Sequence, residues 1–201
     1  MDKRPAVFLD RDGCVNVEDD HIRDISQFRL YPDSLDSIKR LNAAGFLVVV
    51  VTNQSGVARG YMTEELVQRV HHRLLGWAEE AGAVIDGVYY CPHHPEGSVE
   101  RYSFECNCRK PKPGMLLRAS ADLGIDFSRS FVVGDKISDI QLGPAVGARA
   151  ALVTTGFGAE QLKRIASLGY PMPDYVAQGI GGAVDWILSL PGKAGEWKRG
   201  S

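Results

Sequence analysis

Short apolar runs alternate along the chain with longer segments in which apolar residues recur at helical spacing. The runs are continuous and rich in valine, which is typical of strands buried on both faces of a sheet. An alternation of this kind predicts a parallel sheet with helices on both faces. The strands are expected at residues 6–9, 46–51, 84–90, 131–134, 151–153 and 174–176, the last at an edge.

The segments between these strands carry start and stop signals of helices. Thr63 can cap a helix that has two glutamates in its first turn and stops near Gly82. His71 and His72 lie in the middle of this helix and are expected on its solvated face. The other helices are expected from residue 33 or 34 to Gly45, from 113 to 124, in a short segment before the fifth strand, and around 184–188.

The predicted organisation is a single α/β domain of the Rossmann-like kind. A chain of 201 residues suits one sizeable domain, expected over residues 1–190 and followed by a frayed tail at 191–201. The spacing of the strands leaves no room for a large cap domain. Access to a site would then be controlled by the loops at 17–31, 54–61 and 91–110.

Composition and charge exclude several classes of partner. The hydrophobic fraction is 44%, the charged fraction 24% and the net charge −2, so the surface as a whole is not built to hold nucleic acid or an anionic membrane. No signal segment is recognisable and no apolar stretch approaches the ~20 residues of a membrane helix. We expect a monomer in the cytoplasm, where thiols stay reduced.

Polar residues follow three of the predicted strands. Asp10 and Asp12 come after the first, Thr52 after the second and Asp135 after the fourth. The two-residue period of a strand can point Asp10 and Asp12 to the same side, and Gly13 lets the backbone approach a ligand. Ligands of parallel sheets bind at the carboxyl ends of the strands. The alternative for Asp10 and Asp12 is an ordinary strand end at which the aspartates cap the next turn. Polar residues after three strands favour a functional site.

Each of these groups has a role if the reaction is phosphoryl transfer. Mg²⁺ prefers oxygen ligands, which Asp10, Asp135 and the backbone carbonyl of Asp12 can supply. Thr52 can donate a hydrogen bond to the phosphoryl oxygens. Lys110, in a basic run before a helix, is the candidate for neutralising the developing charge. The alternative for that run is a solvated loop.

Three of the four cysteines lie in the segment 91–113, which is otherwise expected to form one long loop. They occur as Cys91-x-His93 and Cys106-x-Cys108, a set of three thiolates and an imidazole that matches a closed tetrahedral Zn²⁺ site. His94 competes with His93 as the fourth ligand. Free thiols or a disulfide between Cys106 and Cys108 are the alternatives, and a reducing compartment argues against the disulfide.

Taken together, these motifs resemble the haloacid dehalogenase superfamily of phosphotransferases. The matching motifs are Asp10-x-Asp12-Gly13, Thr52-Asn53, Lys110-Pro111, and Gly134-Asp135 with Asp139 four residues on. Longer runs narrow the resemblance to the heptose bisphosphate phosphatase family, which serves nucleotide-activated heptose synthesis, mostly for lipopolysaccharide. These runs are residues 8–13, 51–60, 90–95 and 106–111, and the match spans roughly residues 5 to 155.

The resemblance implies a role for each site residue. Asp10 would be the nucleophile, Asp12 the general acid and base, and His93 the zinc ligand two positions after Cys91. Asp139 would orient its neighbours, and Cys14 stands where this family commonly has Thr. The residues expected to bind the phosphoryl group and the rest of a sugar bisphosphate are Glu18, Asp19, Asp20, His21, Asn53, Gln54, Ser55, Arg109 and Lys136.

Two other functions share part of this pattern of motifs. Histidinol-phosphate phosphatases resemble the chain in all four motifs, but their zinc loop and the segment after the second motif differ. The fifteen-residue step from Cys91 to Cys106 and the run at residues 54–60 favour the heptose bisphosphate. A zinc-stabilised binding module with a dead catalytic site is the second alternative, and the intact acidic and basic motif residues argue against it.

Overall fold

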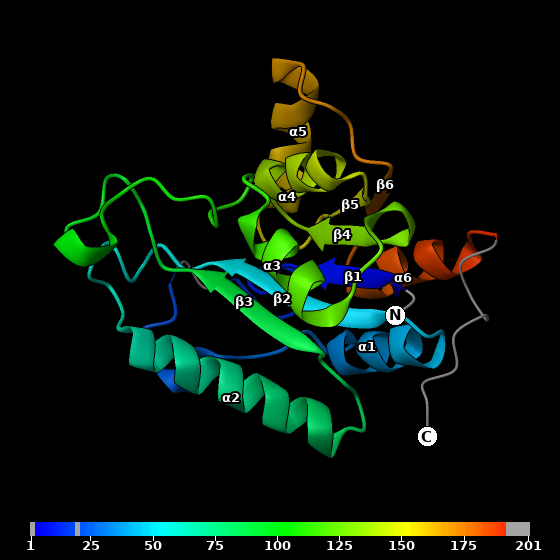
Figure 1. The fold of residues 1–201 in the computed structure, drawn as a ribbon, viewed down its shortest axis with the longest axis horizontal. Helices are drawn as coiled ribbons and strands as arrows, with labels where there is room; N and C mark the ends of the chain where they lie inside the picture. Colours follow the sequence, from blue (N-terminus) through cyan, green and yellow to red (C-terminus); the bar gives the residue numbers. More distant parts are fainter. Residues whose placement is uncertain (1–2, 19–20, 192–201) are drawn as a thin grey trace.

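The computed structural model describes residues 3–18 and 21–191, and the expected tail beyond residue 191 lies outside this part of the chain. Its centre is a six-stranded sheet with the order β3-β2-β1-β4-β5-β6, in which every neighbouring pair is parallel (Figure 1). All six predicted strands are confirmed, with ends that differ by up to three residues. They are β1 (Ala6–Leu9), β2 (Leu47–Asn53), β3 (Gly87–Cys91), β4 (Phe131–Gly134), β5 (Arg149–Val153) and β6 (Tyr175–Ala177).

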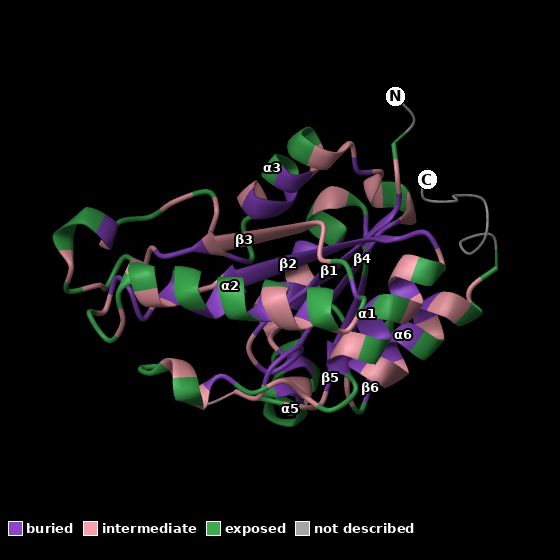
Figure 2. Cartoon of the chain, turned by 90° about the horizontal axis from the view of Figure 1, so that it is seen from below, coloured by how far each residue is buried: buried purple, intermediate pink, exposed green. Residues whose placement is uncertain are grey.

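The central strands are buried on both faces, as their continuous apolar runs require. Along β1, Val7 and Leu9 contribute to one hydrophobic cluster, whereas Phe8 contributes to another on the opposite face. Figure 2 shows this burial as an unbroken purple core through β1, β2 and β4. The alternation follows from the two-residue period of side chains along a strand.

Three helices cover each face of the sheet. The first layer packs Ile38, Leu74 and Val184 against the sheet, and the second packs Leu116, Ile140 and Ile165. Figure 1 shows the two layers, one with α2 and the other with α3 and α5. The first layer consists of α1 (Ser34–Ala43), α2 (Glu64–Glu80) and α6 (Ile180–Ser189); the second consists of α3 (Gly114–Leu123), α4 (Ile137–Leu142) and α5 (Gly158–Leu168).

Most of these helices begin and end near the predicted residues. The Thr63 hydroxyl accepts a hydrogen bond from the backbone N–H of Leu66, so the expected cap of α2 is confirmed. Gly124 ends α3 in the left-handed conformation at φ 66°, where its N–H reaches the Ser120 carbonyl. Helix α5 was not predicted. Only Gly158 and Ile165 are buried on it.

Two expectations from the sequence need correction. His71 is buried and does not lie on a solvated face; only His72 is exposed there. The loop after β3 is not wholly irregular, because residues Glu100–Tyr102 form a 3-10 turn. Three further 3-10 turns in the described chain are Ile25–Gln27, Phe127–Arg129 and Pro144–Val146.

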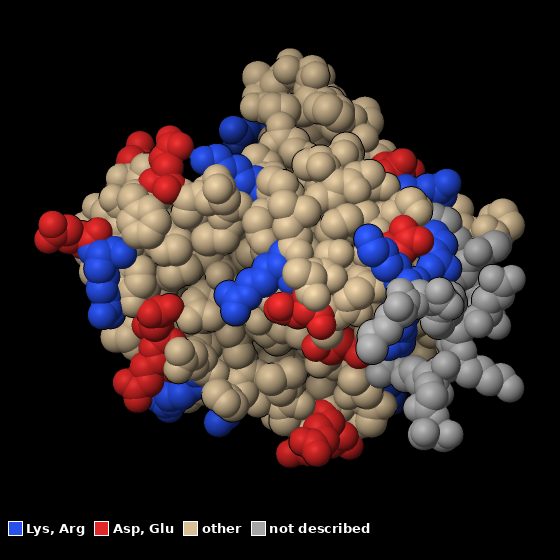
Figure 3. Space-filling model, in the orientation of Figure 1, with Lys and Arg blue, Asp and Glu red and all other residues tan. Residues whose placement is uncertain are grey.

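The surface charge agrees with the balanced composition. On the face shown in Figure 3, basic and acidic side chains are interspersed and do not gather into one basic stripe. Among the described helices, none combines the length and the apolar character that a membrane-crossing helix requires.

Candidate active site

The polar residues that follow the strands meet where the strand order reverses. β1 and β4 are neighbours in the centre of the sheet, and Asp10 and Asp135 come directly after them. This is the switch point at which open parallel sheets bind ligands. A cavity of about 330 Å³ opens at this edge and is lined in part by Asp12, Asn53 and Lys110.

Lys110 forms the buried cationic centre of the site. Its Nζ lies 2.8 Å from Asp10 Oδ1 and 2.7 Å from Asp139 Oδ1, and it donates a hydrogen bond to the Val51 carbonyl at 3.0 Å. Burial lowers the pKa of a lysine, but the two carboxylates raise the pKa of Lys110 above its ordinary value. Lys110 is therefore a fixed positive charge beside Asp10.

Three carboxylates face one another behind the cavity. Oxygen atoms of Asp10, Asp135 and Asp139 all lie within 4.8 Å of one another. Burial, together with the nearby acidic groups, raises the pKa of Asp10 to about 6 and that of Asp135 to about 8, against the opposing effect of the lysines. Such crowding is unfavourable without a compensating cation.

The donor set fits Mg²⁺. Asp135 Oδ1 is buried and has no hydrogen-bond partner, whereas its Oδ2 accepts the backbone N–H of Phe157 at 2.8 Å. Gly13 has a positive φ of 85°, and a Cβ there would collide with the Asp135 carboxylate. An unpartnered carboxylate oxygen and a backbone kept close to it are features of a hard-cation site.

The Asp12 carboxylate is held on both oxygens. Oδ1 accepts hydrogen bonds from Arg11 Nε, Arg11 Nη2 and Asn16 Nδ2 at 3.2, 2.9 and 3.0 Å. Oδ2 accepts from Arg11 Nη2 at 2.9 Å and from Gln54 Nε2 at 2.7 Å. Arg11 and these hydrogen bonds lower the pKa of Asp12 to about 2 despite its burial. In this state Asp12 is a carboxylate, the form that a general base requires.

The second and third motifs are joined by a reciprocal pair of hydrogen bonds. Asn53 Nδ2 donates to the Lys110 carbonyl at 3.2 Å, and the Lys110 N–H donates to Asn53 Oδ1 at 3.0 Å. The Thr52 hydroxyl lies 3.5 Å from Asp12 Oδ2 and accepts from Gln54 Nε2 at 2.7 Å. Gln54, expected from the sequence to line the sugar pocket, thus also links Thr52 to Asp12.

Most of the residues predicted to bind substrate line the same cavity. Lys136 Nζ pairs with Glu18 Oε2 at 3.0 Å and lies 4.9 Å from the centre of the Phe157 ring. Asp19 and Asp20 lie outside the described residues. Five lining residues were not predicted: Arg11, which lies inside the first motif, and Ile22, Met62, Ser138 and Phe157, which are not motif residues. The predicted residues that line the cavity are Asp12, Glu18, His21, Asn53, Gln54, Ser55, Arg109, Lys110 and Lys136.

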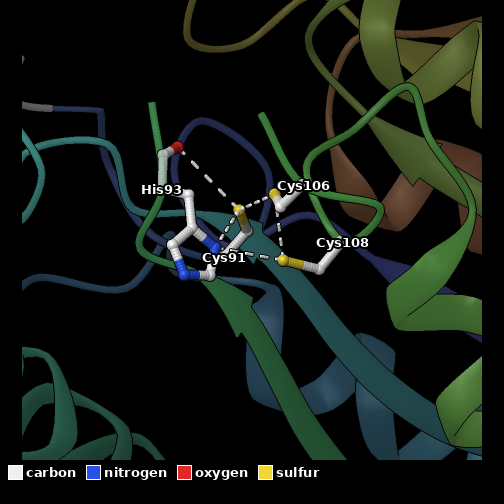
Figure 4. Close-up of side chains that lie close together, drawn as sticks. All are labelled: Cys91, His93, Cys106 and Cys108. Atoms are coloured by element: carbon white, nitrogen blue, oxygen red, sulfur yellow. Dashed lines mark hydrogen bonds between the residues drawn. The ribbon is translucent and has the colours of Figure 1, made fainter. Parts of the chain in front are cut away.

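A second candidate metal centre lies in the loop after β3. The three thiol sulfurs and His93 Nδ1 converge, as Figure 4 shows, at separations of 3.2 to 3.7 Å. A tetrahedron with the usual Zn–S and Zn–N bond lengths has edges of ~3.5 to 3.8 Å. All three cysteines are free thiols, so the alternative of a disulfide between Cys106 and Cys108 is not what the structure contains. His94 does not join the cluster; its Nε2 faces Arg59 Nη2 at 3.1 Å.

The thiol cluster is tied to the carboxylate site through the backbone. Arg109 follows Cys108 directly, and its Nη1 donates to the His93 carbonyl at 3.3 Å. The Gln54 N–H donates to the Cys91 carbonyl at 2.8 Å. The loop after β3 therefore helps to fix two residues that line the cavity, Arg109 and Gln54.

Comparison with known proteins places the chain among phosphatases. A family model described as HAD-hydrolase-like matches residues 107–183. The D-glycero-beta-D-manno-heptose-1,7-bisphosphate 7-phosphatase of Yersinia pestis is 42% identical over 92% of this chain and 90% of its own length. The protein of that name from Escherichia coli K12 is 46% identical over 92% of this chain and 88% of its own.

A solved structure gives the same indication. The D,D-heptose 1.7-bisphosphate phosphatase of B. bronchiseptica, complexed with magnesium and phosphate, superposes with a TM-score of 0.79 at 31% identity. The match covers 92% of this chain and 98% of that one.

Proposed function

Since the chain belongs to the D-glycero-D-manno-heptose-1,7-bisphosphate 7-phosphatase family of haloacid dehalogenase-like hydrolases, we propose that it removes the C7 phosphate of that sugar bisphosphate. The observation that carries the proposal is the buried contact between Asp10 and Lys110, a residue that lines the polar cavity. The product, a sugar 1-phosphate, suits a following nucleotidyl transfer in the synthesis of lipopolysaccharide precursors.

In the first step, a carboxylate oxygen of Asp10 attacks the phosphorus and the bond to the sugar oxygen at C7 breaks. Asp12 gives its proton to that oxygen, which leaves as a hydroxyl. Lys110, Thr52 and the backbone around them stabilise the negative charge on the transferring phosphoryl group.

In the second step, the Asp12 carboxylate takes a proton from water as the water oxygen attacks the aspartyl-phosphate. The bond to Asp10 breaks and inorganic phosphate is released. The proton on Asp12 in the first step must arrive with the substrate, because Arg11 and Gln54 hold the empty site in the ionised form. The proton that Asp12 takes from water leaves with the inorganic phosphate, which returns the empty site to its ionised form.

Asp10, Asp135 and the backbone carbonyl of Asp12 would hold Mg²⁺, with Asp139 orienting Lys110. When bound, this cation offsets the repulsion between the Asp10 carboxylate and a phosphate dianion. The unpartnered Asp135 Oδ1 and the raised pKa of Asp135 support this assignment.

The cluster of Cys91, His93, Cys106 and Cys108 would hold a structural Zn²⁺. All four positions of a tetrahedron are filled by protein ligands, which leaves none open for chemistry. A site of three thiolates requires reduced cysteines, so we place the enzyme in the cytoplasm.

The second phosphate would be recognised by Arg109, whose planar fork suits a phosphate or sugar oxygen. Lys136 lines the same cavity and adds a second cation. A substrate with two anionic groups therefore fits this cavity better than a monophosphate does.

The test compares kcat/KM for both anomers of D-glycero-D-manno-heptose 1,7-bisphosphate with kcat/KM for histidinol phosphate. We expect the bisphosphate to be preferred, the β anomer most of all, with phosphate released from C7. Arg109→Ala should lower kcat/KM for the bisphosphate far more than for p-nitrophenyl phosphate, whereas Lys110→Ala should impair both. Preference for histidinol phosphate, or release from C1, would contradict the proposed substrate.

A further inference from the structure

His71 is a buried histidine that the proposed mechanism does not use. It lies in the middle of α2, sixty positions after Arg11, and only 7% of its surface is exposed. Its Nε2 is 3.1 Å from Arg11 Nη1, and its ring lies 5.4 Å from that of Tyr90. The neighbouring His72 points elsewhere, with Nδ1 2.9 Å from the Gln68 carbonyl.

Arg11 connects His71 to the proposed proton donor. The Nε and Nη2 atoms of Arg11 contact the Asp12 carboxylate, and Nη1 contacts His71. A guanidinium is planar, so the bond at Nη1 fixes the plane in which the other two nitrogens meet Asp12. Arg11 is itself 1% exposed, so water does not replace a lost partner easily.

The chemistry of the acceptor at position 71 is selective. A carboxylate there would compete with Asp12 for the guanidinium, and an apolar side chain would leave Nη1 without an acceptor in a buried site. A neutral imidazole accepts the hydrogen bond and leaves the positive charge of Arg11 for Asp12. Burial and the charge of Arg11 lower the pKa of His71 to about 3, which keeps the ring neutral.

We propose that His71 is a positioning residue that acts through Arg11 to hold the Asp12 carboxylate in the orientation from which it serves the leaving oxygen. The inference rests on the proposed function, in which Asp12 protonates that oxygen. Through His71 and Arg11, the helix α2, which supplies no catalytic group in the proposed mechanism, influences the proton-transfer step.

The inference predicts a dependence on the leaving group. Phenyl phosphate and p-nitrophenyl phosphate have nearly the same shape, but phenolate is the more basic leaving group and needs the proton more. The value of kcat/KM reports the steps up to departure of this group. His71→Leu should lower kcat/KM about tenfold for phenyl phosphate and less than about twofold for p-nitrophenyl phosphate.

Two further variants isolate the hydrogen bond. His71→Gln keeps an acceptor and should restore most of the activity on phenyl phosphate. His71→Asn, with a shorter amide, should behave like His71→Leu and provides the measurement if the leucine variant does not fold. His72→Leu is the matched control, with both esters hydrolysed as by the unaltered chain.

The outcomes separate this inference from the proposed function. Asp12→Asn should show the same leaving-group dependence, in a stronger form. If Asp12→Asn impairs both esters equally, the proposed role of Asp12 fails and the inference with it. A second outcome is that the loss of activity in Asp12→Asn depends on the leaving group, whereas His71→Leu and His71→Asn impair both esters equally or impair neither. In that case only the positioning role of His71 is overturned.

Discussion

The Nζ atom of Lys110 lies 2.8 Å from Oδ1 of Asp10, in a contact that is almost closed to solvent. The two residues stand a hundred positions apart, on the loop before α3 and at the end of β1. Lys110 therefore offsets the negative charge of Asp10, the proposed nucleophile, inside the buried site. Removing either partner should therefore affect stability as well as chemistry.

Replacing Lys110 with Met should destabilise the metal-free protein by about 3–5 kcal/mol, because it leaves Asp10 and Asp139 buried without their cation. Urea unfolding measures the change in free energy. Lys112→Met is the matched control: its ion pair with Glu105 is exposed and worth at most about 1 kcal/mol. Equal effects of the two substitutions would show that the buried ion pairs of Lys110 contribute no more to the free energy of unfolding than an exposed pair does.

Asp10→Asn should abolish turnover of every phosphate ester while the fold is retained. The amide has the shape of the carboxylate, but it is a poor nucleophile and a weaker ligand for Mg²⁺. Steady-state assays and circular dichroism would measure the two properties on the same preparation. Substantial hydrolysis by a folded Asp10→Asn protein would exclude a covalent aspartyl-phosphate at this residue.

Magnesium should stabilise the protein more at pH 8 than at pH 5. The raised pKa values of Asp10 and Asp135 mean that the folded state holds more protons than the unfolded state between pH ~4 and ~8. The metal-free protein therefore loses stability as the pH rises through this window. Binding of Mg²⁺ requires the ionised carboxylates, so the stabilisation by Mg²⁺ increases as the pH rises through this window.

Melting temperatures with and without added Mg²⁺, at both pH values, would measure this linkage. No chelator is used, because it would also compete for a metal in the thiol cluster. Asp135→Asn should remove most of the difference between the two pH values. A magnesium effect that is independent of pH in the unaltered chain would argue against binding to these carboxylates.

Purified protein should contain close to one zinc ion per chain. Metal analysis measures the content, and Cys106→Ser should lower it because the cluster loses one of its thiolates. Loss of the ion should also lower activity, since the loop positions Arg109 and Lys110. Cys14→Ser is the control, because Cys14 lies outside the cluster and should leave the zinc content unchanged.

The strands were predictable because their signal is local. A run such as residues 46–51 is apolar at every position, and burial on both faces of a parallel sheet is its usual explanation. The site residues at the strand ends were predictable for a related reason: carboxyl ends of parallel strands share one edge, so Asp10 and Asp135 meet whatever the details of the helices. The three cysteines of the thiol cluster were predictable from residue type and spacing, whereas the choice of His93 over His94 came from the family resemblance.

What the sequence determined by itself was thus the fold class, the edge of the sheet at which the chemistry lies, and the residue types available there. The tertiary structure alone decided which groups touch. His71 was expected in solvent and is buried against Arg11, and Gln54 proved to hold Asp12 as well as line the cavity. Phe157 beside Asp135 was not anticipated at all. These contacts depend on how α2 and the loops pack on the sheet, and packing between residues far apart in the chain leaves no periodic signal in the sequence.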